Sequence, residues 1–424
     1  MTSANAIIQA LEAINADSFA DTNERHRVED ALVAALNRVR TPWDIGWNHV
    51  WVNAPTNASI KILIDAGIFK KWVENGSKPQ TTDELAEFTS TDPALIRRLL
   101  RQLASQHLIL ETAEDTYAPS PWAIRLGTDP AFPSVYGTFY HDTILPLLGS
   151  LPSFIKETGF KNPRDSDNCT FQYVRGPGTS YFDWVSRDPL HNAEFADAME
   201  CHSRGNLTAW VDLYPTSTLL RGAKPDRPLV VDIGGSKGHD LEKFRLKHAD
   251  ALPDGSLVLE DLPGILQDVR IGDDRRAIAV TPYDFLTPQP VRGARAYFLH
   301  IVLHDWPDDV CVRILRNVAA AMEPGYSKLL IHETLVADVR PSPRVTATDI
   351  SMMAIFASAE RSEREWRRLI ETDGLGLRVV KIWNPHQTME SIIEVELAGE
   401  EAEAREHGPP RGADQDLRTN HPRL

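Results

Sequence analysis

The sequence predicts an α/β protein in which a mostly helical N-terminal part precedes a domain built on a parallel sheet. Apolar residues recur at helical spacing through much of the first half of the chain. From Arg227 onward, short apolar runs of strand character alternate with helical stretches, as in parallel sheets with crossover connections. At 424 residues the chain is too long for one ordinary core, so we expect at least two domains.

Composition narrows the class of protein. Hydrophobic content of 42% and charged content of 25% are typical of soluble globular proteins. A formal charge of −15 disfavours non-specific nucleic-acid binding, which needs basic side chains to neutralise phosphates. The sequence contains neither a signal-peptide pattern nor an apolar run long enough to span a membrane. Three widely spaced cysteines indicate neither a disulfide framework nor a cysteine zinc site, so we expect a cytoplasmic protein.

The N-terminal part reads as helices followed by a small winged motif. The stretch 81-TTDELAEFTSTDPALIRRLLRQLASQHLILE-111 predicts a short helix, a turn at Thr91–Pro93 and a longer helix. The segment that follows, ending in ETAEDTYAPS, predicts a hairpin, which completes a winged-helix pattern. Arg97, Arg98 and Arg101 on the longer helix would suit DNA binding. The acidic charge of the chain favours the other interpretation, a module used for packing or dimerisation.

The C-terminal half contains the strands that position the chemistry. The runs with strand character are RPLVVDIGG, GSLVLEDLP, RAIAV, ARAYFLHIVL, YSKLLIHETLV and MESIIEVELA. HDLEKFRLKHAD and VCVRILRNVAAAME are helical stretches between them. The polar segment from Gly399 to the end, rich in charge with Pro and Gly, predicts a disordered tail.

Three successive strand ends carry acidic residues. The first strand runs into 232-DIGGSKGHDLEKF-244, where glycines let a ligand lie against the backbone and face a helix N-terminus. The second ends in 259-LEDLP-263, whose carboxylate can accept hydrogen bonds from ribose hydroxyls. The third precedes Asp284 in 281-TPYDFL-286. A helix cap or turn explains each one singly, whereas the three together predict a nucleoside-containing cofactor.

The fourth strand ends in 297-YFLHIVLHDWPDDVC-311, which combines a helix start with a candidate base. Pro307 suits a first helical position, and the two aspartates after it face the helix dipole favourably. His300 and His304 would lie roughly 13 Å apart in an extended strand, too far to share a metal ion. His304 beside a nucleoside site fits a general base, because imidazole titrates near neutrality.

These motifs together resemble the plant- and fungal-type S-adenosylmethionine-dependent O-methyltransferases, the caffeic-acid O-methyltransferase-like family. The matching stretches are VVDIGGSKG, LEDLP, YDF, HDWPDD, the strand ending in HET, and 359-AERSEREW-366. TPWDIGWNHVWVNAP and the winged-helix segment resemble the dimerisation domain of its fungal members. The resemblance covers roughly residues 40 to 397 and implies a Rossmann-like methyltransferase domain preceded by a winged-helix dimerisation domain. The expected boundaries are 1–125 for dimerisation, 126–215 for a helical linker and acceptor-pocket region, 216–398 for the methyltransferase domain and 399–424 for the tail.

The resemblance assigns roles to individual residues. His304 matches the catalytic base, and Glu333 and Glu360 match two carboxylates that flank and orient its imidazole. The cofactor-binding positions it implies are Gly234, Gly235, Asp261, Asp284, Phe285, His300 and Ser203. The acceptor-pocket positions are Met199, Phe171 and His141. His300 stands where the family usually has Lys or Arg, and no metal is implied.

The implied reaction is methyl transfer from S-adenosylmethionine to a phenolic or enolic hydroxyl of a small, aromatic or polyketide-like secondary metabolite. A phenol with a pKa near 10 is a weak nucleophile until a base takes its proton. The partners expected are this acceptor and a second copy of the chain, with no nucleic acid or membrane. One departure is Ser236, which replaces the middle glycine of the family's D-x-G-x-G-x-G and puts cofactor affinity in doubt. Two alternatives stay open: a pericyclase on the same fold, which Ser236 and His141 keep possible, and a winged-helix transcription regulator.

Overall fold

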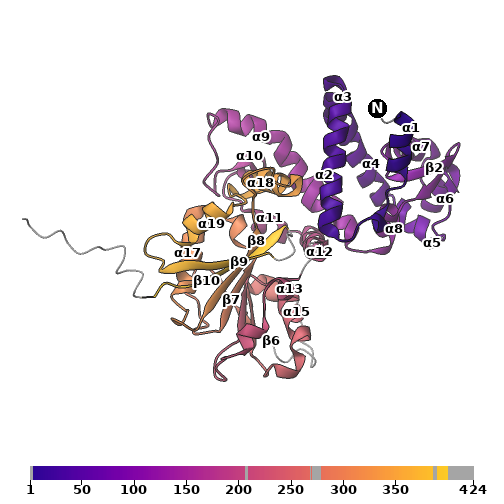
Figure 1. The fold of residues 1–424 in the computed structure, drawn as a ribbon. Helices are drawn as coiled ribbons and strands as arrows, with labels where there is room; N and C mark the ends of the chain where they lie inside the picture. Colours follow the sequence, from indigo (N-terminus) through magenta and orange to yellow (C-terminus); the bar gives the residue numbers. More distant parts are fainter. Residues whose placement is uncertain (1–2, 206–208, 268, 270–277, 385–388, 400–424) are drawn as a thin grey trace, which may run out of the picture. The chain divides into compact units, whose positions relative to one another are not determined.

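The computed structural model describes residues 3–205, 209–267, 269, 278–384 and 389–399. Contacts divide the chain into two compact units, coloured along the sequence in Figure 1. The described residues of the first unit belong to Met1–Thr208, Thr346–Ala359 and Pro385–Met389, and those of the second to Ala209–Val345, Glu360–Asn384 and Glu390–Leu424. Except for Gly399, the predicted tail 399–424 lies outside the described residues. No helix in the described part combines the length and apolarity needed to cross a bilayer.

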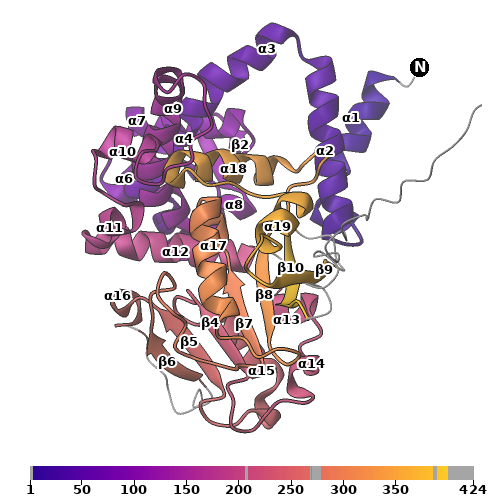
Figure 2. The same ribbon diagram turned by 90° about the vertical axis from the view of Figure 1, so that its left-hand side faces the viewer.

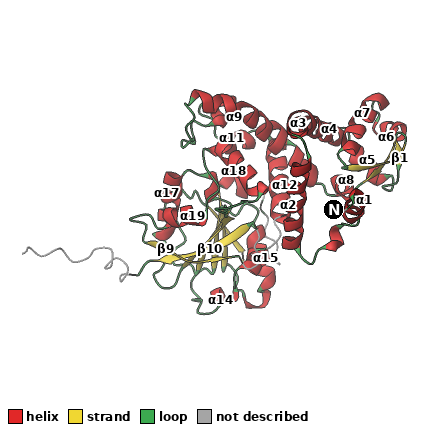
Figure 3. Cartoon of the chain, turned by 45° about the horizontal axis from the view of Figure 1, so that its top comes forward, coloured by secondary structure: helices red, strands yellow, loops and turns green. Residues whose placement is uncertain are grey.

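The first unit is mainly helical, as the secondary-structure colours of Figure 3 show. Its helices up to the small sheet are α1 (Ala4–Glu12), α2 (Thr22–Val39), α3 (Pro42–Trp47), α4 (Asn53–Asp65), α5 (Ile68–Glu74), α6 (Thr82–Thr89) and α7 (Pro93–Ser105). Those after it are α8 (Pro121–Thr128), α9 (Leu145–Glu157), α10 (Thr170–Arg175), α11 (Tyr181–Ser186) and α12 (Pro189–Gly205). Helix α18 (Pro343–Phe356) joins them from far along the sequence, because most of it belongs to the first unit.

The predicted helix, turn, helix and hairpin are all present. Thr81 and Glu84 form a capping box that starts α6, and Asp92 caps α7, whose first residue is Pro93. Strands β2 (Ile109–Ala113) and β3 (Thr116–Pro119) pair antiparallel, and β1 (Gln80–Thr81) adds a third strand to β3. Local capping and turn residues therefore define this segment as the sequence predicted.

Two of the arginines considered for DNA binding are engaged within the motif itself. Arg97 Nε lies 2.8 Å from Asp115 Oδ2, and Arg101 Nη2 lies 3.0 Å from Asp115 Oδ1. Asp115 belongs to the turn of the β2–β3 hairpin, so both ion pairs tie α7 to the wing. These pairs favour the packing interpretation of the motif.

The second unit is built on a seven-stranded sheet in the order β6-β5-β4-β7-β8-β10-β9. Its strands are β4 (Val230–Ile233), β5 (Leu257–Asp261), β6 (Ile278–Pro282), β7 (Ala296–His300), β8 (Lys328–Thr334), β9 (Leu377–Trp383) and β10 (Glu390–Leu397). Its helices are α13 (Trp210–Leu213), α14 (Ser217–Leu220), α15 (His239–Lys247), α16 (Pro263–Leu266), α17 (Asp308–Ala319) and α19 (Glu363–Ile370). This is the predicted Rossmann-like α/β architecture.

Strands β6, β5, β4, β7 and β8 run parallel, so their carboxyl ends lie at one edge of the sheet. That edge receives the glycine turn after β4, the acidic ends of β5 and β6, and the His304 turn after β7. The parallel sheet therefore brings the sequence motifs to one place. Strand β10 is antiparallel to both β8 and β9, which makes the sheet mixed.

Alternating side chains of the central strands fill two cores. Tyr297 and Leu299 of β7 pack on the face covered by α17, which lies across the sheet in Figure 2. Phe298 points to the opposite face, against Trp210 at a ring-centroid distance of 4.6 Å. Burial on both faces explains why β4 and β7 read as continuous apolar runs.

Candidate active site

The turn after β4 requires its two glycines. Gly234 has φ +74°, a left-handed conformation, and a side chain built on it would reach within 3.0 Å of Val302. A Cβ on Gly235 would lie 2.4 Å from Asp232 Oδ2. The amides of both glycines donate to the Glu260 carbonyl, at 2.8 and 3.1 Å. This turn is therefore fixed against β5 and leaves no space for a side chain.

Asp261 at the end of β5 is held by backbone amides. Its Oδ2 accepts from the Ser236 amide at 2.8 Å, and its Oδ1 accepts from Leu262 at 2.7 Å. Ser236, the departure from the family glycine, keeps the conformation that a glycine would adopt, with φ +51°. Each carboxylate oxygen can accept more than one hydrogen bond, so Asp261 keeps capacity for ribose hydroxyls.

The loop after β6 carries Asp284 and Phe285. Asp284 is exposed, and its Oδ1 accepts from the Leu286 amide at 2.9 Å as in an Asx turn. Phe285 packs edge-on against Trp306 at 5.8 Å. Phe285 also lies beside the glycine turn, with its ring 4.0 Å from the position of a Cβ on Gly234. The two strand-end loops therefore meet, as a shared nucleoside site requires.

A buried carboxyl beside the glycine turn supports cofactor binding there. Asp232 is 2% exposed, and its Oδ2 makes no hydrogen bond with the described residues. Burial, followed by the charge of Asp240, raises the pKa of Asp232 well above its ordinary value. A buried polar atom without a partner is costly unless a ligand satisfies it. Together with the glycine turn and Asp261, it fits a cofactor that carries donor groups and a ribose.

His304 lies on a tight turn between β7 and α17. Ile301 has φ +51°, which is rare for a β-branched residue, and its amide donates to the His332 carbonyl at 3.1 Å. A short 3-10 helix, Leu303–Asp305, then presents the imidazole. His304 Nδ1 lies 2.9 Å from Glu360 Oε1, and Nε2 lies 3.3 Å from Asp305 Oδ1. Glu360 therefore contacts the ring at Nδ1, and the role that the resemblance implies for this pair stays a prediction.

Glu333 contacts the turn in a different way. Its Oε1 accepts from three successive amides, those of Val302, Leu303 and His304, at 3.1, 2.8 and 3.3 Å. Three converging amides form a concave anion site of the kind that binds carboxylates and phosphates. Glu333 thus fixes the backbone that carries the imidazole, while Glu360 fixes the ring itself.

Three carboxylates determine the charge of His304. Burial by itself lowers the pKa of this imidazole, but Asp305, Glu333 and Glu360 outweigh burial and raise the pKa to about 10. Burial raises the pKa of Glu333 to about 7 and that of Asp305 to about 6. The imidazole of the cofactor-free site is therefore mostly protonated at neutral pH.

His300 belongs to a separate buried cluster. Its Nδ1 lies 2.6 Å from Asp240 Oδ2 and its Nε2 lies 3.4 Å from Glu390 Oε2. The ring stacks on His332 with a centroid distance of 4.1 Å and an angle of 21°. Near-parallel rings do not aim their nitrogen lone pairs at one point, so we assign no metal to these side chains. His300 links β7 to α15, the helix that follows the glycine turn.

The predicted acceptor-pocket residues belong to the first unit. Phe171 is fully buried and packs edge-on against Tyr181 at 5.7 Å, and Met199 lies half-buried on α12. His141 lies on a π-helical turn, Thr138–Ile144, and its buried Nε2 makes no hydrogen bond with described residues. Such turns are frequent at functional sites. The side chain of Ser203 lies outside the described residues.

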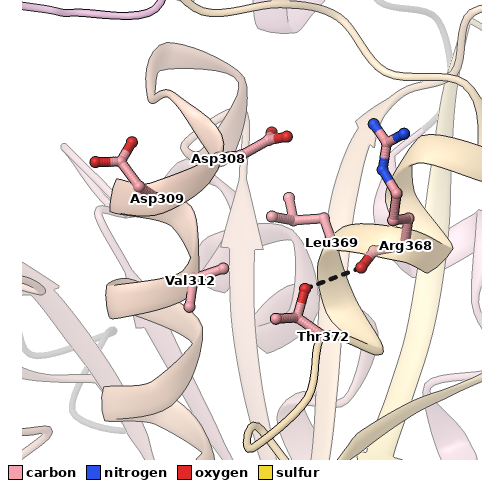
Figure 4. Close-up of a pocket in the computed structure, with 6 residues that line it drawn as sticks. All are labelled: Asp308, Asp309, Val312, Arg368, Leu369 and Thr372. Atoms are coloured by element: carbon pink, nitrogen blue, oxygen red, sulfur yellow. Dashed lines mark hydrogen bonds between the residues drawn. The ribbon is translucent and has the colours of Figure 1, made fainter.

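A pocket of 390 Å³ lies between α17 and α19. Figure 4 shows its lining, with Asp308, Asp309 and Val312 from α17, Arg368 and Leu369 from α19, and Thr372 from the turn after α19. None of the predicted catalytic or cofactor-binding residues lines it. We therefore do not assign the cofactor to this pocket.

Comparison with known proteins decides the family. A family model described as the O-methyltransferase domain matches residues 158–376. The O-methyltransferase mfmE of Annulohypoxylon moriforme is 36% identical over 392 residues, covering 92% of this chain and 95% of that protein. The O-methyltransferase asqD of Emericella nidulans is 37% identical over 341 residues, covering 79% of this chain and 85% of that protein. The chain belongs to the O-methyltransferase family. The predicted enzyme class, and with it S-adenosylmethionine as the cofactor, is confirmed.

Solved structures of similar fold include both a methyltransferase and a pericyclic reaction enzyme. LepI in complex with S-adenosylmethionine has a TM-score of 0.80 and 27% identity, covering 93% of this chain and 97% of that chain. A second solved structure, described as a pericyclic reaction enzyme, has a TM-score of 0.80 and 26% identity. OxaC in complex with S-adenosylhomocysteine and oxaline has a TM-score of 0.78 and 25% identity, covering 93% and 96% of the two chains. The fold prediction is confirmed, and the alternative of pericyclic chemistry remains open.

Sequence reasoning missed several residues that shape this methyltransferase site. Asp305 stands inside the HDWPDD motif, where it was overlooked because the neighbouring aspartates explained the motif as a helix start. Asp232 is the acidic residue of the first strand end, but its burial and its unpaired Oδ2 could not be predicted from the sequence. Arg361 follows Glu360 directly, but the carbonyls that it binds are more than fifty residues away in the sequence. No local sequence pattern predicts these contacts.

Proposed function

We propose that this methyltransferase transfers a methyl group to a phenolic or enolic hydroxyl of a small secondary metabolite, with His304 as general base. The observation that carries the proposal is the His304–Glu360 pair, 2.9 Å between Nδ1 and Oε1, at the sheet edge that also carries the glycine turn. With Nδ1 held by Glu360, Nε2, which lies 3.3 Å from Asp305 Oδ1, is the nitrogen that would take the proton of the acceptor. S-adenosylmethionine, when bound, supplies the electrophilic methyl group and leaves as S-adenosylhomocysteine.

The residues of the sheet edge support cofactor binding by distinct contacts. Gly234 and Gly235 leave the backbone accessible to the methionine portion, and Asp232 offers a buried acceptor for a donor group. Asp261 would hold the ribose hydroxyls, and Phe285 would pack on the adenine. His300 would act on this site through α15, because both of its ring nitrogens face carboxylates.

His304 would take the hydroxyl proton as the acceptor oxygen attacks. A phenol with a pKa near 10 and an imidazole with a pKa of about 10 are closely matched, so the proton moves between them at small energetic cost. Glu360 stabilises the imidazolium that forms. A positioned base increases the rate by a factor on the order of 10² to 10⁴. Alignment of the two reactants contributes most of the remaining rate acceleration.

A screen with isotopically labelled methyl donor tests the proposal and identifies the acceptor. The enzyme is incubated with labelled S-adenosylmethionine and an extract rich in phenolic and polyketide metabolites, in parallel with His304→Ala. We expect one labelled product with wild type and a loss of at least about 100-fold with the variant. Label transfer at an undiminished rate by His304→Ala would contradict the role of the base, provided that both proteins unfold at the same temperature.

The pericyclase alternative has a specific observation in its favour, the similarity to a pericyclic reaction enzyme with a TM-score of 0.80. The same screen separates the two functions. A pericyclase would change an unlabelled metabolite of the extract without forming S-adenosylhomocysteine, and an O-methyltransferase would form one equivalent of it for each labelled product.

We further propose that the chain forms a homodimer through its N-terminal helices. Trp43, Trp47 and Trp51 form a row on α3 and the turn that follows, with side chains 71%, 46% and 62% exposed. Exposed aromatic rows of this kind mark protein interfaces. Analytical ultracentrifugation should show a dimer for wild type and a shift toward monomer for Trp47→Gln.

The expected cytoplasmic location stays a prediction.

A further inference from the structure

Arg361 holds the carbonyl side of the turn that carries His304. This arginine is 4% exposed and directly follows Glu360, the partner of the imidazole. Its Nη1 donates to the Leu303 carbonyl at 3.1 Å and its Nη2 to the Trp306 carbonyl at 2.8 Å. The guanidinium therefore binds the backbone on both sides of His304.

The remaining contacts fix the guanidinium itself. Arg361 Nε donates to Asp308 Oδ1 at 3.0 Å, and Nη2 lies 2.9 Å from the same oxygen. The guanidinium also lies over the ring of buried Trp366, 5.1 Å from its centroid. A planar group with donors in fixed directions loses little freedom when it binds several acceptors at once, and a lysine cannot reproduce this arrangement.

The turn needs this restraint because its backbone is strained. A β-branched residue at positive φ, as at Ile301, persists only where the surroundings determine the conformation. Glu333 binds the amides of Val302, Leu303 and His304, and Arg361 binds the carbonyls of Leu303 and Trp306. The peptide groups around the imidazole are thus held from both sides by two buried side chains, with Glu333 accepting from the amides and Arg361 donating to the carbonyls.

We propose that Arg361 is a positioning residue for methyl transfer, which aims His304 at the acceptor by fixing the Leu303–Trp306 turn. The inference rests on the proposed function, in which His304 is the base. Among the contacts of the described residues, the Arg361 side chain reaches neither the imidazole nor a residue assigned to the cofactor, so we assign its effect to the turn. An error of about 1 Å in the position of a catalytic group costs on the order of 100-fold in rate.

Substitutions of Arg361 test the inference against a purely structural role. In Arg361→Met the carbonyls of Leu303 and Trp306 lose their hydrogen bonds to the guanidinium. We expect kcat to fall by about 100-fold while the KM for S-adenosylmethionine changes by less than about threefold. Arg361→Lys keeps the positive charge but loses the planar guanidinium, whose donors reach both carbonyls at once. We expect kcat to fall by about tenfold. Arg367→Lys on α19, the helix that follows Arg361, is the control, because Arg367 pairs only with surface Glu363 among the contacts described.

The pH dependence of kcat is the second measurement. Loosening the turn moves the imidazole relative to Asp305, Glu333 and Glu360, so the acid limb of the profile should move to lower pH in Arg361→Met. A purely structural arginine would lower the unfolding temperature and leave kcat and the pH limb of the folded enzyme unchanged. Arg361→Lys should fold in any case. A lower unfolding temperature in this variant, with kcat and the pH limb unchanged, would overturn the inference.

A double-mutant cycle separates failure of this inference from failure of the proposed function. If Arg361 acts through His304, adding Arg361→Met to His304→Ala should cause no further loss of kcat. Equal losses in both backgrounds would mean that Arg361 acts elsewhere, which would overturn the inference and leave the base in place. Full activity of His304→Ala alone would instead overturn the proposed function.

Discussion

His300 and His304 lie four residues apart and are both paired with carboxylates, but they differ in their surroundings. Each has a carboxylate on Nδ1, Asp240 at 2.6 Å for His300 and Glu360 at 2.9 Å for His304. His300 is the last residue of β7, enclosed by the His332 ring and Glu390 of the neighbouring strands. His304 lies beyond the strand on a turn. Pairing with a carboxylate therefore does not distinguish the two histidines, and the proposal for His304 rests on its position beyond the sheet edge.

The largest effect expected at this pair of sites is that of Glu360→Gln. The amide can present its NH₂ group to Nδ1 and favour the wrong tautomer, so we expect kcat to fall by about 10² to 10⁴. Steady-state kinetics with the acceptor from the screen measure this loss. Glu363→Gln, on the exposed first turn of α19, is the matched control. A loss of less than fivefold in Glu360→Gln would remove Glu360 from the mechanism.

Glu333 should contribute more to stability than to the electronic state of the imidazole. Glu333→Ala leaves three amides of the turn without their acceptor, which should reduce the free energy of unfolding by about 2–4 kcal/mol. Glu333→Gln keeps one acceptor oxygen and should cost less than half as much. Chemical denaturation measures both changes. Equal stability of Glu333→Ala and wild type would contradict the anchoring role.

Asp305 should set the pH at which the enzyme works. The base must be unprotonated, and the pKa of His304 is raised to about 10, so activity should increase with pH between about 7 and 10. Asp305→Asn removes one of the charges that raise this pKa, so the acid limb should move down by about one pH unit. Asp309→Asn, an exposed aspartate nearby, should leave the profile unchanged. An unshifted limb in Asp305→Asn would show that Asp305 does not act on the imidazole.

The smallest effect expected is that of Ser236→Gly at the cofactor turn. A glycine adopts φ +51° without strain, so stability should rise by about 0.5–1 kcal/mol, and affinity for S-adenosylmethionine should rise by up to about threefold. Ser90→Gly in the first unit is the matched control, because Ser90 has φ +55° and no predicted role in binding. Weaker cofactor binding by Ser236→Gly would mean that the serine hydroxyl is itself a cofactor contact.

Much of the fold could be predicted from the sequence because its signals are local. The capping residues Thr81 and Glu84 and the buried runs of β4 and β7 each specify an element from adjacent residues. Strand β9 was missed because it is an edge strand in which Arg378 and Lys381 interrupt the apolar pattern. The assignment of α18 to the first unit depends on tertiary contacts alone.

The site could be predicted only in part. His304, Glu333 and Glu360 were identified because each stands in a motif of its own. The different tasks of the two glutamates depend on which atoms they meet across the sheet, and no spacing in the sequence encodes that. The stacking of His300 on His332 follows from strand register, which pairs these residues across β7 and β8. The contacts of Arg361 likewise required the folded turn.

The most direct test of the central claim is a single-turnover measurement of labelled methyl transfer by His304→Gln and His300→Gln, side by side at saturating S-adenosylmethionine. We expect His304→Gln to be slower than wild type by at least about 100-fold. His300→Gln should remain within about threefold of wild type at saturation, although it should need more cofactor. A slow His300→Gln beside a fully active His304→Gln would contradict the assignment of the base.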